Sequence, residues 1–309
     1  VPYRERGRLH VPWTIRGSLD ASNALRRRQP ADVTFFPTQS IGLFASHAVG
    51  GRKYAISVDA TPRQLDSMGM WYGHHRSRDS VEAMKRALYR RVLQRASFVV
   101  AWSDWARTSL VDDYGVAGES ISVVHPGASA AFFSLARVPS PRPTILFVGG
   151  DFERKGGPLL LEVFARAQDR ADLLLVTSAP VEERPGLRVV SDATPGSVQL
   201  LAAYASADIF CLPTYGDCTS VAVEEAMAAG LPVVTTGVGS NASTVRDGCS
   251  GIIVPTGSAE ALNVALSRLI DDPALRTAMG AHGRDLAAKE MDADKNAIRI
   301  VSLMRSAAS

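Results

Sequence analysis

Two cations follow closely after a pair of glycines in this 309-residue chain. Arg154 and Lys155 come just after Gly149 and Gly150, where a short apolar run has ended. An arginine can bind two phosphate oxygens at once and a lysine acts as a point charge, so together they could neutralise a diphosphate group. The alternative is an Arg–Lys pair in a loop with both side chains in solvent.

Two carboxylates eight positions apart form a second candidate group. Asp217 lies in a polar loop, and Glu225 lies on a helix predicted to begin near Val221. An ionised carboxylate offers two acceptor oxygens, so Glu225 could accept hydrogen bonds from a pair of ribose hydroxyls. The alternative is that Glu224 and Glu225 are both charges on the helix surface, and the spacing alone favours neither reading.

Backbone groups accompany both sets of charges. The N–H groups of Ser220, Val221 and Ala222 open the predicted helix, and such groups can receive phosphate oxygens. Gly149 and Gly150 form the turn after the apolar run. The segment around them lacks the Lys-Ser or Lys-Thr ending of a P-loop and the spacing of a dinucleotide fingerprint. It therefore predicts only a strand–turn–helix junction with two nearby cations.

Apolar runs alternate with helical stretches from Thr144 onward. Short apolar runs bounded by turn residues predict buried strands, and strands that alternate with helices imply a parallel sheet covered on both faces. Helical patterns lie near residues 160–167, 197–206 and 221–229, and helices follow to the end. The predicted strands are Thr144–Val148, Leu173–Val176, Leu187–Val190, Ile209–Leu212, Val233–Thr236 and Gly251–Val254.

The first half of the chain predicts a smaller α/β region. A basic helix is predicted at Asp79–Ala96, and Ser103 has the type and position of a helix N-cap. Four strands are few for a doubly wound domain, and Val1–Leu9 lacks a convincing first strand, so we expect an N-terminal domain without its first elements. The four predicted strands are Val33–Phe36, Tyr54–Val58, Phe98–Ala101 and Ile121–Val124.

A proline-rich segment separates the two regions. Arg137–Pro143 carries three prolines in seven residues, a composition typical of linkers. We therefore predict one domain at residues 1–137 and a second at residues 138–291, followed by a final helix at residues 292–309.

The stretch from Ala207 to Thr236 resembles the signature of retaining glycosyltransferases of family 4, which have the GT-B fold. The resemblance is strong over residues 144–255 and loose before them. It implies two Rossmann-like α/β domains that face a cleft, with the final helix crossing back onto the N-terminal domain. The matching stretches are Ala207-Asp208, Leu212-Pro213-Thr214, Glu225-Ala226-Met227-Ala228 and Gly230-Leu231-Pro232-Val233.

The resemblance also implies roles for the charged residues. In the family, a glutamate at the position of Asp217 approaches the transferred sugar, and the glutamate at the position of Glu225 binds the donor ribose. An arginine and a lysine of the family bind the diphosphate. Lys155 matches that lysine, Gly150 stands at the arginine position, and Arg154 is expected to supply the guanidinium from nearby.

Other positions match the family less well. Ser243 stands where the family has a glutamate, and we assign it no role. Asp59 ends a predicted strand where many members carry a histidine near the reacting carbon; it is expected to contact the donor sugar or the acceptor, and the alternative is a loop-capping aspartate. His47, His74 and His75 have no ligand-like spacing, so we expect no protein-held metal and no cofactor.

The net charge of +3 is divided unevenly. Residues 1–143 hold 20 Lys and Arg against 11 Asp and Glu, a net charge of +9, which leaves −6 for the remainder. Much of the excess lies on the helix Asp79–Ala96. This helix could be a solvated basic face, or it could meet an anionic membrane surface or a phosphate-bearing acceptor, because each basic residue near such a surface adds ~1 kcal/mol. No nucleic-acid partner is predicted, since no binding motif accompanies the charge.

Composition sets outer limits. A chain with 46% hydrophobic and 21% charged residues is neither collagen-like nor largely disordered. No apolar run reaches the ~20 residues of a membrane span. Cys211, Cys218 and Cys249 match no zinc or disulfide spacing, so we expect reduced thiols in a cytoplasmic protein, peripheral to the inner face of the membrane if the basic helix binds lipid.

Together these features predict a metal-independent retaining glycosyltransferase. Its donor would be a nucleotide-diphosphate sugar and its acceptor a sugar, a lipid-linked molecule or another hydroxyl compound. Two alternatives stay open. One is a GT-B nucleotide-sugar epimerase, which Lys155 and Glu225 disfavour. The other is a catalytically weak or inactive nucleotide-sugar-binding protein, which the departures at Gly150, Asp217 and Ser243 motivate.

Overall fold

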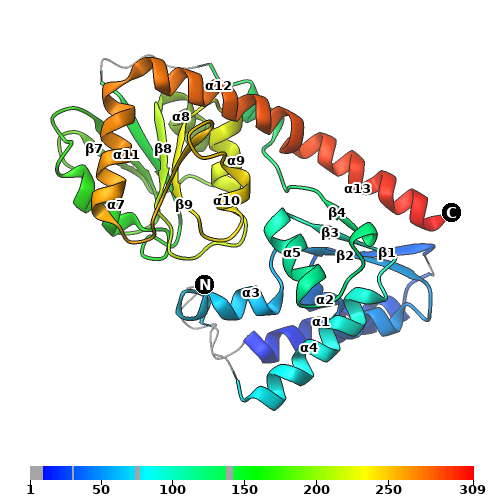
Figure 1. Cartoon of the computed structure of the whole chain (residues 1–309). Helices are drawn as coiled ribbons and strands as arrows, with labels where there is room; N and C mark the ends of the chain where they lie inside the picture. The colour runs from blue at the N-terminus through cyan, green and yellow to red at the C-terminus, as the bar shows by residue number, and fades with distance from the viewer. Residues whose placement is uncertain (1–9, 30, 74–76, 137–141) are drawn as a thin grey trace. The chain divides into compact units, whose positions relative to one another are not determined.

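The computed structural model describes residues 10–29, 31–73, 77–136 and 142–309, so the stretch Val1–Leu9 lies outside the described residues. The chain forms two compact units (Figure 1). The first unit runs up to His125 and also contains Ala297–Ser309, and the second is Pro126–Asn296. Each unit is built on its own parallel sheet, and each is considered by itself.

The second unit contains a six-stranded, wholly parallel sheet in the order β10-β9-β8-β5-β6-β7. Counted along the unit, this is the 3-2-1-4-5-6 order of doubly wound nucleotide-binding sheets. The strand order reverses between β5 and β8, and ligands of such sheets bind beyond the carboxyl ends of the strands at that point. The strands are β5 (Thr144–Val148), β6 (Asp172–Val176), β7 (Leu187–Val190), β8 (Ile209–Leu212), β9 (Val233–Thr236) and β10 (Gly251–Val254).

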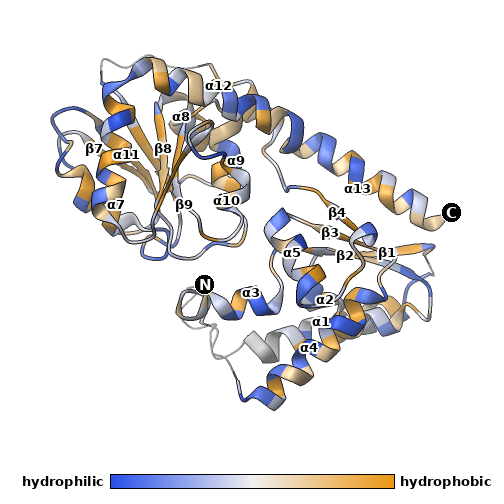
Figure 2. Ribbon diagram, viewed as in Figure 1, coloured by the Kyte–Doolittle hydropathy of each residue, from blue (hydrophilic) through white to orange (hydrophobic). Residues whose placement is uncertain are grey.

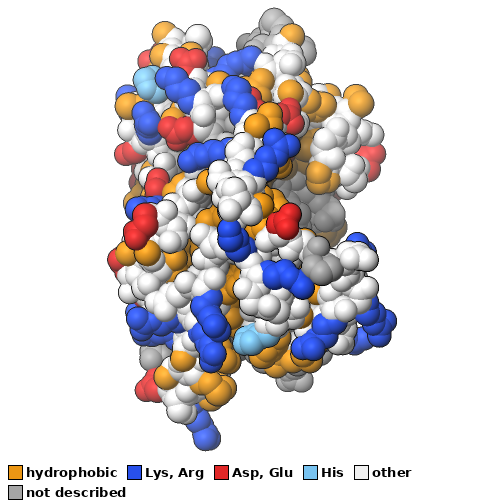
Figure 3. All heavy atoms as spheres, turned by 90° about the vertical axis from the view of Figure 1, so that its right-hand side faces the viewer, with side chains coloured by type: hydrophobic (Ala, Val, Ile, Leu, Met, Phe, Trp, Pro, Cys, Tyr) orange, Lys and Arg blue, Asp and Glu red, His pale blue; other side chains and the backbone are white. Residues whose placement is uncertain are grey.

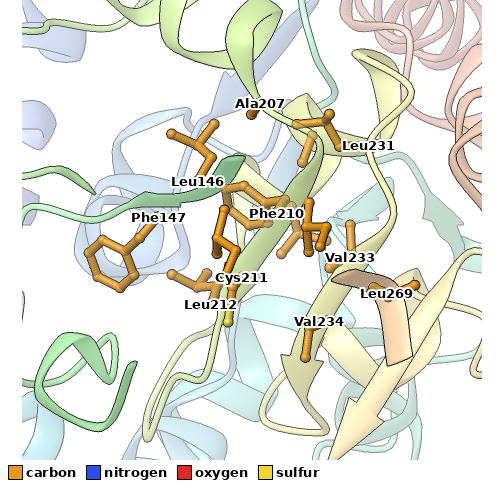
Figure 4. Packing of buried hydrophobic residues seen from close by; sticks show 14 of the residues in the cluster. Leu146, Phe147, Ala207, Phe210, Cys211, Leu212, Leu231, Val233, Val234 and Leu269 are labelled. Atoms are coloured by element: carbon orange, nitrogen blue, oxygen red, sulfur yellow. The ribbon is translucent and has the colours of Figure 1, made fainter. Parts of the chain in front are cut away.

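All six strands predicted for this region are confirmed, with β6 beginning one residue earlier. Their apolar side chains form the core of the unit, as the hydrophobic strands in Figure 2 and the packing in Figure 4 show. Leu146, Phe147 and Phe210 are completely buried there. Each such side chain stabilises the fold by roughly 1.5–3 kcal/mol, so the apolar runs that define the strands also supply most of the packing energy.

The helices of the second unit cover this sheet. Ser197, Ser258 and Asp272 cap three of them, each accepting a hydrogen bond from a backbone N–H of the first turn. A side chain at any of these positions that could not accept would leave that N–H without its partner. The helices are α6 (Ala130–Phe133), α7 (Gly157–Phe164), α8 (Val198–Ser206), α9 (Val221–Ala228), α10 (Asn241–Thr244), α11 (Ala259–Asp271) and α12 (Pro273–Glu290).

The first unit contains a four-stranded parallel sheet in the order β1-β2-β3-β4. Its strands, β1 (Val33–Phe36), β2 (Lys53–Val58), β3 (Phe98–Ala101) and β4 (Ile121–Val123), confirm the four predicted ones within a residue at each end. Around them lie α2 (Gln39–Ala48), α3 (Pro62–Ser67), α4 (Asp79–Gln94) and α5 (Asp104–Asp112), with 3-10 turns at Gly69–Tyr72 and Gly118–Ser120. Ser103 caps α5 as predicted, because its hydroxyl accepts from the N–H of Ala106.

The helix α1 (His10–Arg26) has no counterpart among the predicted elements. Its sequence contains Gly17 and Ser18 and no acidic residue in the first turn, so local signals for a helix are weak. Packing against α2 compensates: the buried Ser18 hydroxyl donates to Ile41 O at 2.7 Å and accepts from Phe44 N at 2.6 Å. Tertiary contacts therefore determine this helix.

The last helix, α13 (Ala293–Ala308), begins in the second unit, and its residues from Ala297 on belong to the first. Ile300, Leu303 and Met304 pack there against a small core that contains Phe98. The chain first passes from the first unit to the second at Pro126, ahead of the proline-rich segment. Phe132 of α6, which follows Pro126, is already buried in the core of the second unit.

Candidate functional site

Two loops lie beside each other beyond the carboxyl ends of β5 and β8. One runs from Gly149 to Gly156, and the other from Pro213 to Ser220. Tyr215 N donates to Arg154 O at 2.9 Å. Gly156 has φ +80°, and a Cβ there would lie 2.1 Å from Pro213 O, so only glycine permits this approach. The contacts bring together charged residues that are about 60 positions apart, as the topology of the sheet requires.

Arg154, Lys155 and Asp217 form one cluster in these loops. Lys155 Nζ makes an ion pair with Asp217 Oδ2, and Arg154 Nη1 lies 3.8 Å from Asp217 Oδ1. Arg154 also donates to Gly216 O and, at 3.1 Å, to Asp151 Oδ2. The side chains of both cations are only 14–15% exposed, so they are not a solvated pair. Asp217 is the anion that they hold in this structure.

Ser220 joins the cluster through its side chain. Its hydroxyl donates to Asp217 Oδ2 and makes no capping bond to α9. At the same helix end, Val221 N donates to Thr219 O at 3.1 Å, so this predicted phosphate donor is engaged in a turn, while Ala222 is half-buried behind it. The positive end of the helix dipole still lies beside Asp217, where an anion is stabilised.

Glu225 lies on α9 and is half-buried. The hydroxyl of Tyr204, a fully buried residue of α8, donates to Glu225 Oε2 at 2.8 Å. Burial raises the pKa of Glu225 to about 7; the Tyr204 hydrogen bond lowers this pKa, and the Glu224 carboxylate raises it. The sequence pattern did not reveal Tyr204 as a site residue. A tyrosine in a mostly apolar helix is the signal, because its buried hydroxyl needs a partner.

Glu224 and Glu225 are not a pair of surface charges. Glu224 is completely buried, and its Oε2 accepts a hydrogen bond from Gly127 N at 2.7 Å. Consecutive helix residues differ in direction by about 100°, so the two carboxylates have different surroundings.

A third loop, which follows β9, packs against the Asp217 loop. Gly239 has φ +62°, and a Cβ there would lie 1.9 Å from Asp217 O. Ser240 N donates to Cys218 O at 2.9 Å. This backbone-to-backbone contact holds the Asp217 loop in place without any charged side chain.

Asp59 belongs to the first unit, directly after β2, and is half-buried. The residue that caps the following helix α3 is Thr61, which forms a capping box with Gln64. Contact of Asp59 with a donor sugar or an acceptor stays a prediction. Among the described residues no group of three or more His, Cys, Asp and Glu side chains could hold a metal ion. No helix in the described ranges is long and apolar enough to cross a membrane.

Two family models match the chain, one in each half. The model described as Glycosyltransferase Family 4 matches residues 2–132, and the model described as Glycosyl transferases group 1 matches residues 142–272. The chain belongs to glycosyltransferase family 4.

Curated relatives of this family 4 chain include D-inositol 3-phosphate glycosyltransferases. The protein of Corynebacterium aurimucosum is 28% identical over 66% of this chain and 55% of its own length. The protein of Kineococcus radiotolerans is 30% identical over 62% of this chain and 53% of its own length. The chain thus spans about half the length of the curated relatives that it matches.

Solved structures share the fold of this family 4 member. Sucrose-phosphate synthase from Thermosynechococcus elongatus has a TM-score of 0.77 at 19% identity, covering 99% of this chain and 80% of that one. Anabaena HepE in complex with UDP has a TM-score of 0.72 at 16% identity, with coverages of 96% and 82%. The fold is therefore GT-B, with two Rossmann-like α/β domains.

Three positions depart from the family 4 pattern, and the structure describes each. Gly150 is exposed with open space where a Cβ would be, so the missing arginine leaves no packing defect. By contrast, a Cβ added at Gly149 would lie 3.1 Å from the Lys155 side chain. Ser243 is exposed and donates to Ser240 O at 2.8 Å. The shorter Asp217 pairs directly with the lysine of the motif.

Proposed function

We propose that this chain transfers a sugar from a nucleotide-diphosphate donor to an acceptor hydroxyl, with retention at the anomeric carbon. The observation that carries the proposal is the cluster of Arg154, Lys155 and Asp217 at the strand-order reversal, on the same unit as Glu225. Retention is the outcome expected from membership of family 4.

The charges suggest a binding sequence. A diphosphate would replace Asp217 as the partner of Arg154 and Lys155, with the positive end of α9 adding to its stabilisation. Asp217, released from the cations, would then accept hydrogen bonds from the sugar hydroxyls. As the bond to the sugar breaks, the cations would stabilise the charge that develops on the leaving diphosphate. Two fixed cations supply the charge compensation, so the proposal includes no divalent metal.

Glu225 would bind the donor ribose. One oxygen of its carboxylate accepts a hydrogen bond from the Tyr204 hydroxyl, and the carboxylate can accept further hydrogen bonds from ribose hydroxyls. The Tyr204 bond fixes the carboxylate before the ligand arrives, which reduces the ordering cost of binding. The names of the relatives, D-inositol 3-phosphate glycosyltransferase and MMP alpha-(1->4)-mannosyltransferase, support sugar transfer. The HepE complexes with UDP and UDP-glucose support a nucleotide-sugar donor.

Turnover tests the proposal. The full chain is incubated with UDP-, GDP- and ADP-sugars and a panel of hydroxyl acceptors, and release of nucleoside diphosphate and the anomeric configuration of the product are measured by NMR. We expect one donor to give a product of unchanged anomeric configuration, and Lys155→Ala to abolish it. Binding of a donor without turnover would favour the inactive nucleotide-sugar-binding protein, and an isomerised donor would favour the epimerase.

We also propose that the acceptor is presented at an anionic membrane surface through α4, which would place the protein at the inner face of the cytoplasmic membrane. Val81, Met84 and Leu88 follow each other at helical spacing and are 37–57% exposed, and Arg91 and Arg95 are exposed beside them. Lys and Arg side chains also lie among hydrophobic ones on the right-hand side of the view in Figure 1, which Figure 3 shows face on. Such a mixture binds the interface of an anionic bilayer.

Vesicle sedimentation tests the membrane proposal. The full chain should sediment with vesicles of anionic lipid and not with neutral ones, and Met84→Asp combined with Leu88→Asp should abolish sedimentation. Equal sedimentation of the wild type and this double variant would contradict it.

A further inference from the structure

Glu224 is a buried carboxylate that the proposed function does not use. It is completely buried on α9, and its Oε2 accepts from Gly127 N at 2.7 Å, across 97 positions of sequence. Burying a carboxylate is unfavourable unless hydrogen bonds hold it in place. The contact therefore fixes the position of Gly127 relative to α9.

Gly127 lies where the chain enters the second unit. The first unit ends at His125, and the second begins with Pro126. The chain leaves the second unit again between Asn296 and Ala297. Both crossings thus lie within a few residues of the segments 126–128 and 291–293, which we call the crossing segments.

The two crossing segments are hydrogen-bonded to each other. Ala128 N donates to Met291 O at 2.8 Å, and Ala293 N donates to Ala128 O at 3.0 Å. Gly127 has φ +76°, and a Cβ there would lie 2.7 Å from Met291 O, so only glycine permits the pairing. Asp292 between them accepts from Lys295 N at 3.1 Å and so caps the start of α13. The crossing segments are one connected piece of structure.

Glu224 connects this piece to the helix that carries Glu225. A helix of two turns moves as a rigid body. A donor held by Glu225 and a crossing segment held by Glu224 would therefore keep a fixed position relative to each other. An error of about 1 Å in the placement of reacting groups can lower a rate about 100-fold. Asp59, which is expected to contact the donor sugar or the acceptor, lies on the first unit, which the chain reaches only through the crossing segments.

We propose that Glu224 is a positioning residue for the proposed transfer reaction: it fixes the crossing segments to the donor-binding helix through the Gly127 N–H. This inference rests on the proposed function. It predicts that an acceptor oxygen at this position is required, and a neutral amide oxygen can also accept from Gly127 N.

Three variants of the full chain test it. Glu224→Gln keeps an acceptor oxygen, and Glu224→Leu removes it at similar volume. Met227→Ala is the matched control, because Met227 is fully buried on the same helix and does not contact the crossing segments through a hydrogen bond in the described structure. Measured are kcat, the donor KM, the Kd of the bound nucleoside diphosphate, the Tm, and amide hydrogen exchange of the peptide that spans Gly127 and Ala128.

At pH 8, where Glu225 is mostly ionised with or without the Glu224 carboxylate, we expect Glu224→Leu to lower kcat at least tenfold with donor KM and nucleotide Kd unchanged, and to speed exchange in that peptide. Glu224→Gln should keep most of the wild-type kcat and most of the wild-type protection from exchange in that peptide. Met227→Ala should lower the Tm with little change in kcat or in exchange at Gly127. Equal losses of kcat in the Leu and Gln variants, or exchange at Gly127 that is the same in all variants, would overturn the inference. A wild type that binds no nucleotide and gives no transfer would instead overturn the proposed function, and the exchange measurement would still decide whether Glu224 holds the crossing segments.

Discussion

Glu225 combines enough exposure to bind a ligand with enough burial to perturb its ionisation. Its carboxylate is desolvated on the side of the Tyr204 hydroxyl, and Glu224 adds a second carboxylate one residue away. Burial is the largest cause of the raised pKa, and the neighbouring carboxylate acts in the same direction. A ribose ligand needs the ionised form, so donor binding should respond to pH near neutrality.

The first prediction is that donor affinity falls as the pH decreases below 7. With a pKa of about 7, Glu225 is mostly protonated at pH 6 and loses acceptor capacity. A nucleotide sugar should therefore bind roughly tenfold more weakly at pH 6 than at pH 8. Titration calorimetry at both values measures this, and Glu225→Gln should bind weakly without a pH dependence. The same affinity for the wild type at pH 6 and pH 8 would contradict the assignment.

Stability without ligand should show the opposite dependence. The folded-state pKa of Glu225, about 7, lies above the ordinary value of 4.5, so ionisation is easier in the unfolded chain. The free energy of unfolding therefore loses a contribution as the pH rises from about 4.5 to 7. We expect Glu225→Gln to have a higher Tm than the wild type at pH 8 and a smaller advantage at pH 5. Thermal melts of both proteins check this, and an advantage that is larger at pH 5 would be inconsistent with it.

At the scale of elements, three loops converge on Asp217 because β5, β8 and β9 are neighbours in a parallel sheet. The loop after β9 approaches with its backbone, and Gly239 makes the approach possible. Because parallel strands end at the same edge, loops that are far apart in sequence share one surface. The geometry of the site is thus a property of strand order as much as of its side chains.

Gly239→Ala should disturb the site, while Gly237→Ala should not. Gly239 has φ +62° and a Cβ would lie 1.9 Å from Asp217 O, whereas a Cβ at Gly237 would be 3.6 Å from its nearest neighbour. The left-handed conformation alone costs about 1–2 kcal/mol for alanine. We expect a lower Tm and weaker nucleotide binding for Gly239→Ala and near wild-type values for Gly237→Ala. Equal behaviour of the two variants would argue against the close approach.

The ten strands in the described part of the chain could be predicted from sequence because each is a short apolar run between turn residues. The cluster of Arg154, Lys155 and Asp217 could be anticipated because its segments resemble a known signature. Helix α1 could not, since its stability comes from contacts with α2. The contact of Glu224 with Gly127 could not either, because the two residues are 97 positions apart and no local pattern relates them.

At the scale of the whole molecule, each unit has its own hydrophobic core, and the groups assigned to the diphosphate and the ribose all lie in the second. The strongly basic first part of the chain contributes none of them. The proposed nucleotide site is thus assembled from the loops and helices around one sheet, and nucleotide binding can be measured without any knowledge of the acceptor.

Calorimetric titration of the full chain with UDP, GDP and ADP shows whether Lys155 and Glu225 belong to a nucleotide-binding site. One nucleoside diphosphate should bind with a stoichiometry of about one, and Lys155→Ala and Glu225→Ala should each weaken it roughly tenfold or more, as expected for the loss of a hydrogen bond to a charged group. Lys289→Ala, an exposed lysine on α12 of the same unit, should leave the Kd unchanged. If none of the three nucleotides binds, or if neither Lys155→Ala nor Glu225→Ala weakens binding, the proposed nucleotide site is wrong.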